Sequence, residues 1–158
     1  MTRRKKIGDV YEIKTSKGLA YFQYTHENQK FGSLIRVLDE FYAKRPLTKD
    51  LQNLVNKKHK FQTFCYLNDA IKKAEVVFIE NLEIPLLATN FPIFKGTNSM
   101  PKRDPLDKIW WLWDGEKSWR VGKLSLEEQM KYPIKKLCDA TALIKNIETG
   151  KFFSDTLC

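Results

Sequence analysis

The segment that most constrains the fold of this chain is a tryptophan-rich β-hairpin, Trp110–Arg120. The pair Asp114-Gly115 separates two β-prone runs, and it is a strong hairpin signal because both central residues of the tight turn need positive φ. A two-residue loop sets Trp113 opposite Glu116. A four-residue loop changes the partners but leaves the two faces as they are, so the sequence predicts the hairpin in either register.

Side chains alternate between the two faces of a strand, which divides the hairpin into an apolar and a mixed face. The apolar face is expected to lie in the core and carries Trp110, Leu112, Trp119 and Val121. The mixed face carries Trp111, Trp113 and Arg120, with Arg120 within cation–π reach of Trp111. Trp and Arg dominate interface hot spots, so these three are the candidate partner-binding residues. The alternative is that a helix covers this face and the indoles only pack against it.

Other segments supply further strands and helices. Alternating runs predict strands over 9–15, 19–25, 33–41, 61–66 and 76–80. Caps predict helices that start at Thr48, Asn68, Ser125 and Asp139, and Gly150 ends the last of them. The proline-rich stretch 83–107 is expected to be mostly extended loop. The fold class is α+β, a twisted and mainly antiparallel sheet or partly open barrel with helices packed on it.

The length of 158 residues predicts a single domain over 1–158, with residues 1–6 as a basic, disordered tail. The sequence has no apolar run of about 18 residues that would predict a transmembrane helix. The basic start is not followed by the apolar region of a signal peptide. We therefore expect a cytoplasmic protein that does not contact the membrane.

Cysteine and histidine usage bears on metal and redox chemistry. The cysteines, Cys65, Cys138 and Cys158, are odd in number and form no C-x-x-C pair, which favours free thiols in a reducing compartment. With only His26 and His59 besides them, no zinc-type ligand set can be assembled. The sequence therefore predicts neither a metal site nor a cofactor.

The positive net charge of the chain makes nucleic acid one of its possible partners. Lys and Arg number 28 and Asp and Glu 19, which gives 28 − 19 = +9. The basic residues come as scattered pairs, such as Lys57-Lys58 and Lys135-Lys136, and this pattern is more typical of a solvated surface than of a phosphate track. A nucleic-acid-binding module stays open as an alternative, because the Gly8-Asp9-Val10 opening also resembles SH3-like barrels.

The sequence contains none of the common catalytic motifs that would indicate an enzyme. The chain has no P-loop, dinucleotide-binding, nucleophile-elbow or zincin motif. The least favoured alternative is a small nuclease that uses His26 and His59 as general acid and base. Cys138, which precedes Asp139, could act as a thiol nucleophile, yet it fits an apolar helix face equally well. No catalytic residue is assigned.

The order of the segments resembles the bacterial immunity protein 26 family over nearly the whole chain, from Ile7 to Gly150. The segments that carry this resemblance are Ile7–Ile13, Gly18–Gln23, Ile84-Pro85, Phe91–Lys95, Trp110–Gly115, Gly122-x-Leu124 and Ile147-Glu148-x-Gly150. The resemblance implies an immunity protein that protects its producer from a polymorphic toxin delivered between competing bacteria. Such proteins bind and occlude the toxin, so the expected partner is a cognate toxin protein. The net charge of +9 then implies a toxin that is acidic or is not a nuclease.

Overall fold

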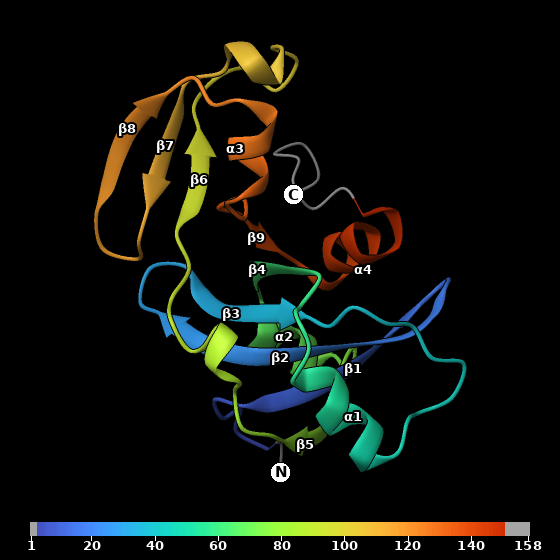
Figure 1. Ribbon diagram of the computed structural model, residues 1–158. Coiled ribbons are helices and arrows are strands. Elements are labelled where there is room, and N and C mark those ends of the chain that lie inside the picture. Colours follow the sequence, from blue (N-terminus) through green and yellow to red (C-terminus); the bar gives the residue numbers. More distant parts are fainter. Residues whose placement is uncertain (1–2, 151–158) are drawn as a thin grey trace.

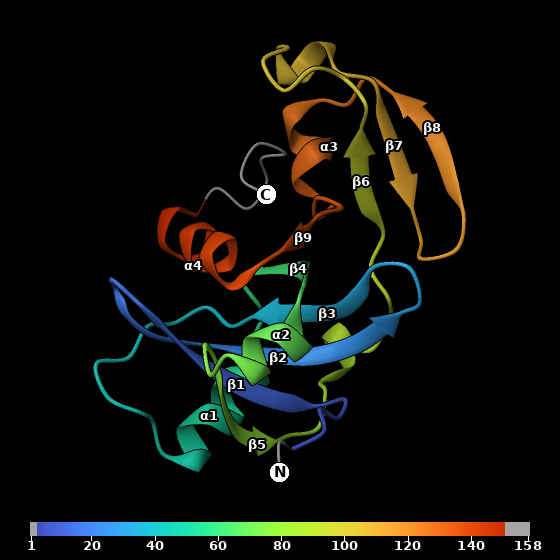
Figure 2. The same ribbon diagram turned by 180° about the vertical axis from the view of Figure 1, so that it is seen from behind.

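The computed structural model describes residues 3–150 and has an α+β fold, as the sequence predicts (Figures 1 and 2). The strands are β1 (Asp9–Thr15), β2 (Gly18–Asn28), β3 (Gly32–Val37), β4 (Phe61–Cys65), β5 (Val77–Asn81), β6 (Phe94–Thr97), β7 (Trp110–Trp113), β8 (Ser118–Gly122) and β9 (Leu137–Cys138). The α-helices are α1 (Thr48–Val55), α2 (Leu67–Lys72), α3 (Leu126–Met130) and α4 (Ala140–Thr149), and the 3-10 helices are η1 (Leu86–Ala88) and η2 (Pro105–Asp107).

The strands form two separate sheets. The large sheet has the order β5-β1-β2-β3-β4-β9, and the small sheet has the order β6-β7-β8. Strands β1 to β4 form an antiparallel meander, while β9 joins β4 in parallel. Within the described residues neither sheet closes into a barrel, and the small sheet stands apart above the large one in Figure 1.

Glycine is required at the turn between β1 and β2. Gly18 has φ +121°, and a Cβ atom there would lie 2.8 Å from the carbonyl oxygen of Tyr42. An L side chain rarely adopts this backbone conformation, so the sequence places the turn correctly.

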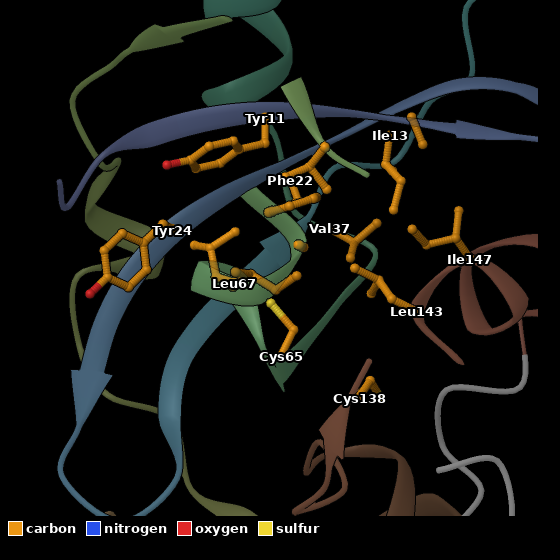
Figure 3. Packing of buried hydrophobic residues seen from close by; sticks show 14 of the residues in the cluster. Tyr11, Ile13, Phe22, Tyr24, Val37, Cys65, Leu67, Cys138, Leu143 and Ile147 are labelled. Atoms are coloured by element: carbon orange, nitrogen blue, oxygen red, sulfur yellow. The ribbon is translucent and has the colours of Figure 1, made fainter. Parts of the chain in front are cut away.

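Both faces of the large sheet are covered. On one face Tyr11 stacks on Phe22, with ring centroids 5.5 Å apart. This core is closed by Leu67 of α2 and by Leu143 and Ile147 of α4 (Figure 3). On the opposite face the helix α1 packs its buried side chains against the sheet; this second cluster contains Val10, Tyr21, Leu38, Leu51, Leu54, Val55 and Leu82. Two-sided burial gives the large sheet most of the buried apolar side chains.

Helix caps are partly as predicted. Ser125 and Glu128 form a capping box, the Asp139 side chain accepts from the N–H of Ala142, and Gly150 ends α4 with φ +70°. Thr48 and Asn68 are not caps, because each lies inside its helix. The N-cap positions are held by Leu47 and Tyr66 without a side-chain hydrogen bond.

Residues 3–6, which the sequence assigns to a disordered basic tail, instead lie against the large sheet. Arg3 forms an ion pair of 2.5 Å with the carboxylate of Asp9, which is fully buried. Lys5 donates to the Ser33 hydroxyl at 2.6 Å and pairs with Glu27 at 3.0 Å. Buried acceptors therefore hold this basic segment in place.

Candidate functional site: the tryptophan hairpin

The predicted hairpin is confirmed as the strands β7 and β8, and its turn is fixed by Asp114 and Gly115. The Asp114 carboxylate accepts from the backbone N–H groups of Lys117 at 2.8 Å and Glu116 at 2.9 Å. These two N–H groups lower the pKa of the Asp114 carboxyl. Gly115 has φ +101°, and a Cβ atom there would lie 2.9 Å from the ring of Phe91. Both conformation and space therefore demand glycine.

The hairpin uses the four-residue loop. Trp113 lies opposite Ser118, Trp111 lies opposite Arg120 and Leu112 lies opposite Trp119, with a bulge between Trp110 and Trp111. Trp111 and Arg120 therefore share one face of the sheet, as the alternation predicts.

A strand that the sequence did not predict joins the hairpin to the rest of the molecule. The expectation of a loop over 83–107 is wrong at β6, which pairs antiparallel with β7. Its other edge is tied to the chain after α3, because Lys95 N–H donates to the Pro133 carbonyl and the Lys135 N–H donates to Lys95. Four residues that include Gly96 carry little strand propensity of their own, so β6 depends on pairing with β7.

Trp113 is buried at the turn end of the hairpin, with 7% of its surface exposed. Its ring lies 5.2 to 5.9 Å from four phenylalanine rings, those of Phe31, Phe64, Phe91 and Phe94. The Lys135 amine lies 4.4 Å from its ring centroid. The cover consists of aromatic rings from the large sheet, β6 and the neighbouring loops, and not of a helix. Trp113 therefore anchors the hairpin and is not part of an open binding platform; of the two alternatives that the sequence left open it is covered, although not by the helix that was expected.

Trp111 and Arg120 are both exposed, and 39% of the Trp111 surface is open to solvent. Beside Trp111 lies an open groove of about 390 Å³, which Lys135, Thr97 and Asn98 also line. Burial and the nearby charge of Lys30 lower the pKa of the Lys135 amine. This face therefore presents the Trp111 indole and the Lys135 amine at the groove, with Arg120 directly opposite Trp111 on β8, and we call it the Trp111 face.

On the opposite face of the hairpin only the β7 side chains are buried in the core. Trp110 and Leu112 are buried as predicted, and Trp110 packs with Leu124 and Ile134. The expectation of a core position is wrong for Trp119 and Val121, which are 38% and 36% exposed. The helix α3 lies beside β6, on the side away from the outer strand β8 (Figure 1).

The two histidines of the nuclease hypothesis lie in different surroundings. His26 contacts the Thr25 hydroxyl and the Thr89 carbonyl, each at 2.9 Å, and its ring meets Phe91 edge-on. His59 lies beside Arg36 instead, at 3.4 Å. Their hydrogen-bond partners share no residue, so the structure does not bring the pair together as a general acid and base.

Cysteine positions offer little chemistry. Cys65 is a free cysteine, and burial raises the pKa of its thiol to about 12, which keeps it protonated. Cys138 is buried and disulfide-bonded, so the expectation of a free thiol is wrong for this residue, and its sulfur accepts a hydrogen bond from the Asn146 amide at 3.5 Å. Cys158 lies outside the described residues.

Clusters of metal ligands and membrane-spanning helices are both absent from residues 3–150. That range contains no cluster of three or more His, Cys, Asp or Glu side chains arranged to hold a metal ion. It also contains no helix with the length and apolar character needed to cross a membrane.

Comparison with known proteins gives no match. No family model, no curated protein and no solved structure matches the chain.

Proposed function

We propose that this chain is an immunity protein that binds and neutralises a cognate polymorphic toxin, and that the Trp111 face makes the contact. The observation that carries the proposal is the exposed Trp111 indole directly opposite Arg120, on a small sheet that projects from the body of the molecule (Figure 2). Exposed Trp and Arg side chains are the residue types that most often dominate binding energies at protein interfaces. The family resemblance of the segment order supplies the class of partner.

The construction of the hairpin supports a role in binding. The Asp114-Gly115 turn and the buried Trp113 ring fix the backbone beneath Trp111. A contact surface that is already ordered loses less conformational entropy when a partner docks. The groove beside Trp111 is open, so it can accept a side chain of the partner.

Charge indicates the kind of surface that the partner presents. The Trp111 face carries Arg120 and the Lys135 amine, and the chain as a whole has a net charge of +9. Both favour an acidic surface on the toxin, since complementary charge speeds association and disfavours other partners. Neutralisation then follows from steric occlusion and needs no catalytic residue in this chain.

The test is growth protection against the toxin encoded beside this gene. Cells that express the toxin should survive when they also express the wild-type chain. The double variant Trp111→Ala/Arg120→Gln should lose protection, whereas Trp119→Ala, which removes an equally exposed indole from the other face, should keep it. Protection by the double variant equal to that of the wild type would place the contact elsewhere. Absence of protection by the wild type would remove the proposal.

A nucleic-acid-binding module is the second candidate, and the net charge of +9 favours it. Binding of this kind weakens steeply with salt, because each neutralised phosphate releases counterions. Retention of the chain on single-stranded RNA, measured from low to physiological salt, should show this slope. Retention without a salt slope would reject the second candidate.

A further inference from the structure

A basic pocket shares no lining residue with the groove beside Trp111. It has a volume of about 360 Å³ and lies between the chain that leads into β4 and the chain that follows α3. Its lining consists of residues 58–62 together with Met130, Lys131 and Pro133. Three lysines and one histidine are among these residues, and none of the lining residues is acidic. Phe61, Met130 and Pro133 give it an apolar wall.

The charge of Arg36, on β3, lies directly behind this pocket. Its side chain is fully buried. It donates to the Gln23 amide oxygen at 2.9 Å and to the carbonyls of Val55 and Lys57 at 2.9 and 2.8 Å. All of these acceptors are neutral, and within the described residues no carboxylate contacts Arg36. Burial without a counter-ion lowers the pKa of the guanidinium to about 10, so a positive charge stands here without compensation.

His59 connects Arg36 to the pocket. The Arg36 Nε–H donates to His59 Nδ1 at 3.4 Å, so the proton of the neutral imidazole sits on Nε2. Burial, together with the charges of Arg36 and Lys58, lowers the pKa of His59 to about 4. The ring is therefore neutral at pH 7 and surrounded by positive charge. A bound anion would relieve the repulsion between the positive charges of Arg36 and Lys58.

The three lysines that line the pocket differ in the partners of their amines. The Lys60 amine donates to the Ile147 carbonyl at 3.4 Å and lies over the Phe41 ring. Lys58 and Lys131 are exposed, and neither forms an ion pair within residues 3–150. These two amines, one from each side of the pocket, are thus the groups that can close on an anion.

We propose that this pocket binds a small phosphate-bearing molecule of the nucleotide class. Lys58 and Lys131 hold the phosphates over His59, while Phe61, Met130 and Pro133 contact the less polar part of the ligand. Lysine amines are strong phosphate partners, and the buried Arg36 adds a positive field that water screens only weakly. A volume of about 360 Å³ falls within the range of small-molecule sites. The proposal does not depend on the toxin-binding function.

The test uses ADP as the probe and adenosine as the ligand without phosphate. Calorimetry should show binding of ADP and no binding of adenosine. The double variant Lys58→Gln/Lys131→Gln should bind ADP at least about tenfold more weakly, the loss of one charged contact being enough for that. The matched control Lys14→Gln/Lys72→Gln removes the same charge from exposed positions on β1 and α2 and should bind as the wild type does.

A second readout is the pKa of His59, followed by NMR with and without saturating ADP. Arg36 on β3 and Lys58 act on the ring by their charges, Lys60 and Lys131 line the same pocket, and Gln62 of β4 interacts with the ring as a neutral group. All of these charges are positive, so a bound diphosphate should raise the pKa of His59 from about 4.

Three results would overturn the proposal. The first is no binding of ADP by the folded wild-type chain. The second is equal weakening by both double variants, which would indicate non-specific attraction to a basic surface. The third is binding of single-stranded RNA that depends on Lys58 and Lys131 while ADP does not bind, since the ligand would then be a nucleic acid.

Discussion

The two sheets of this molecule contrast in how they treat their side chains. The large sheet is covered on both faces, by α2 and α4 on one side and by α1 on the other. The small sheet is covered at its base and on part of one face, and its outer strand β8 is largely exposed. Aromatic content alone therefore does not mark a core: the small sheet buries Trp110 and Trp113 but displays Trp111 and Trp119.

Replacement of a buried ring in the large sheet should have the largest effect on stability. Phe22 is fully buried between Tyr11 and the helices. Phe22→Ala should lower the free energy of unfolding by about 3–5 kcal/mol in urea titrations, because it leaves a cavity that the sheet cannot fill. Phe22→Leu should cost under about 1.5 kcal/mol. If Phe22→Ala lowers the free energy of unfolding by less than about 1.5 kcal/mol, the core is not packed rigidly on both faces of the large sheet.

Replacement of Trp113 tests whether its buried ring anchors the hairpin to the large sheet. Trp113→Ala removes the ring at the centre of four phenylalanines, and we expect a loss of about 3 kcal/mol, the lower end of the range for a buried aromatic residue. Thermal unfolding measures this loss. If the variant proves as stable as the wild type, Trp113 does not anchor the hairpin.

The ion pair of Glu12 with Arg45 should give the large sheet an acid dependence of smaller size. Arg45 donates to the carboxylate at 2.8 and 3.1 Å and Tyr21 donates at 2.6 Å, and these hydrogen bonds lower the pKa of Glu12 below its unfolded value. The resulting stability is complete above the unfolded pKa and is lost as the pH falls through the folded pKa.

Urea midpoints measured from about pH 5 to about pH 3 should therefore fall, and Arg45→Gln should reduce that slope. Lys73→Gln, which breaks an exposed pair with Asp69, serves as the control and should leave the slope unchanged. Equal slopes for Arg45→Gln and the wild type would show that this pair does not stabilise the fold.

Exposed indoles should have the smallest effect on folding. Trp111→Ala and Trp119→Ala each remove a ring that is more than one third exposed, and each should cost less than about 1 kcal/mol in urea titrations. A loss near 3 kcal/mol in either variant would mean that this indole belongs to the core and is not displayed.

Much of the large sheet was predictable from the sequence, because its signals are local. Asp9–Thr15 alternates, Gly18 adopts the positive φ of its turn, and Asp139 caps α4, which packs on this sheet. The cap at Thr48 was misplaced by one residue. Propensity cannot distinguish a first helical residue from a cap when the true cap, Leu47, uses only its backbone.

The small sheet was less predictable, because its order depends on contacts that are distant in sequence. The hairpin followed from Asp114-Gly115, but β6 forms only by pairing with β7 and by bonding to Pro133. Because the sequence did not predict β6, the alternation of side chains in the hairpin indicated which residues share a face but not which of them are buried. Trp113 is therefore covered, which the sequence left open, and Trp119 is open where the core was expected. A signal for β6 was the apolar pair Ile93-Phe94 after Pro92.

The most direct test of the proposed toxin-binding role is the affinity of the purified chain for the toxin encoded beside its gene. Trp111→Ala should weaken binding by at least about 2 kcal/mol, or about thirtyfold, as expected for a hot-spot residue. Trp119→Ala should bind as tightly as the wild type, and both variants should keep their stability. Equal affinities for Trp111→Ala and the wild type would contradict the claim that the Trp111 face is the contact.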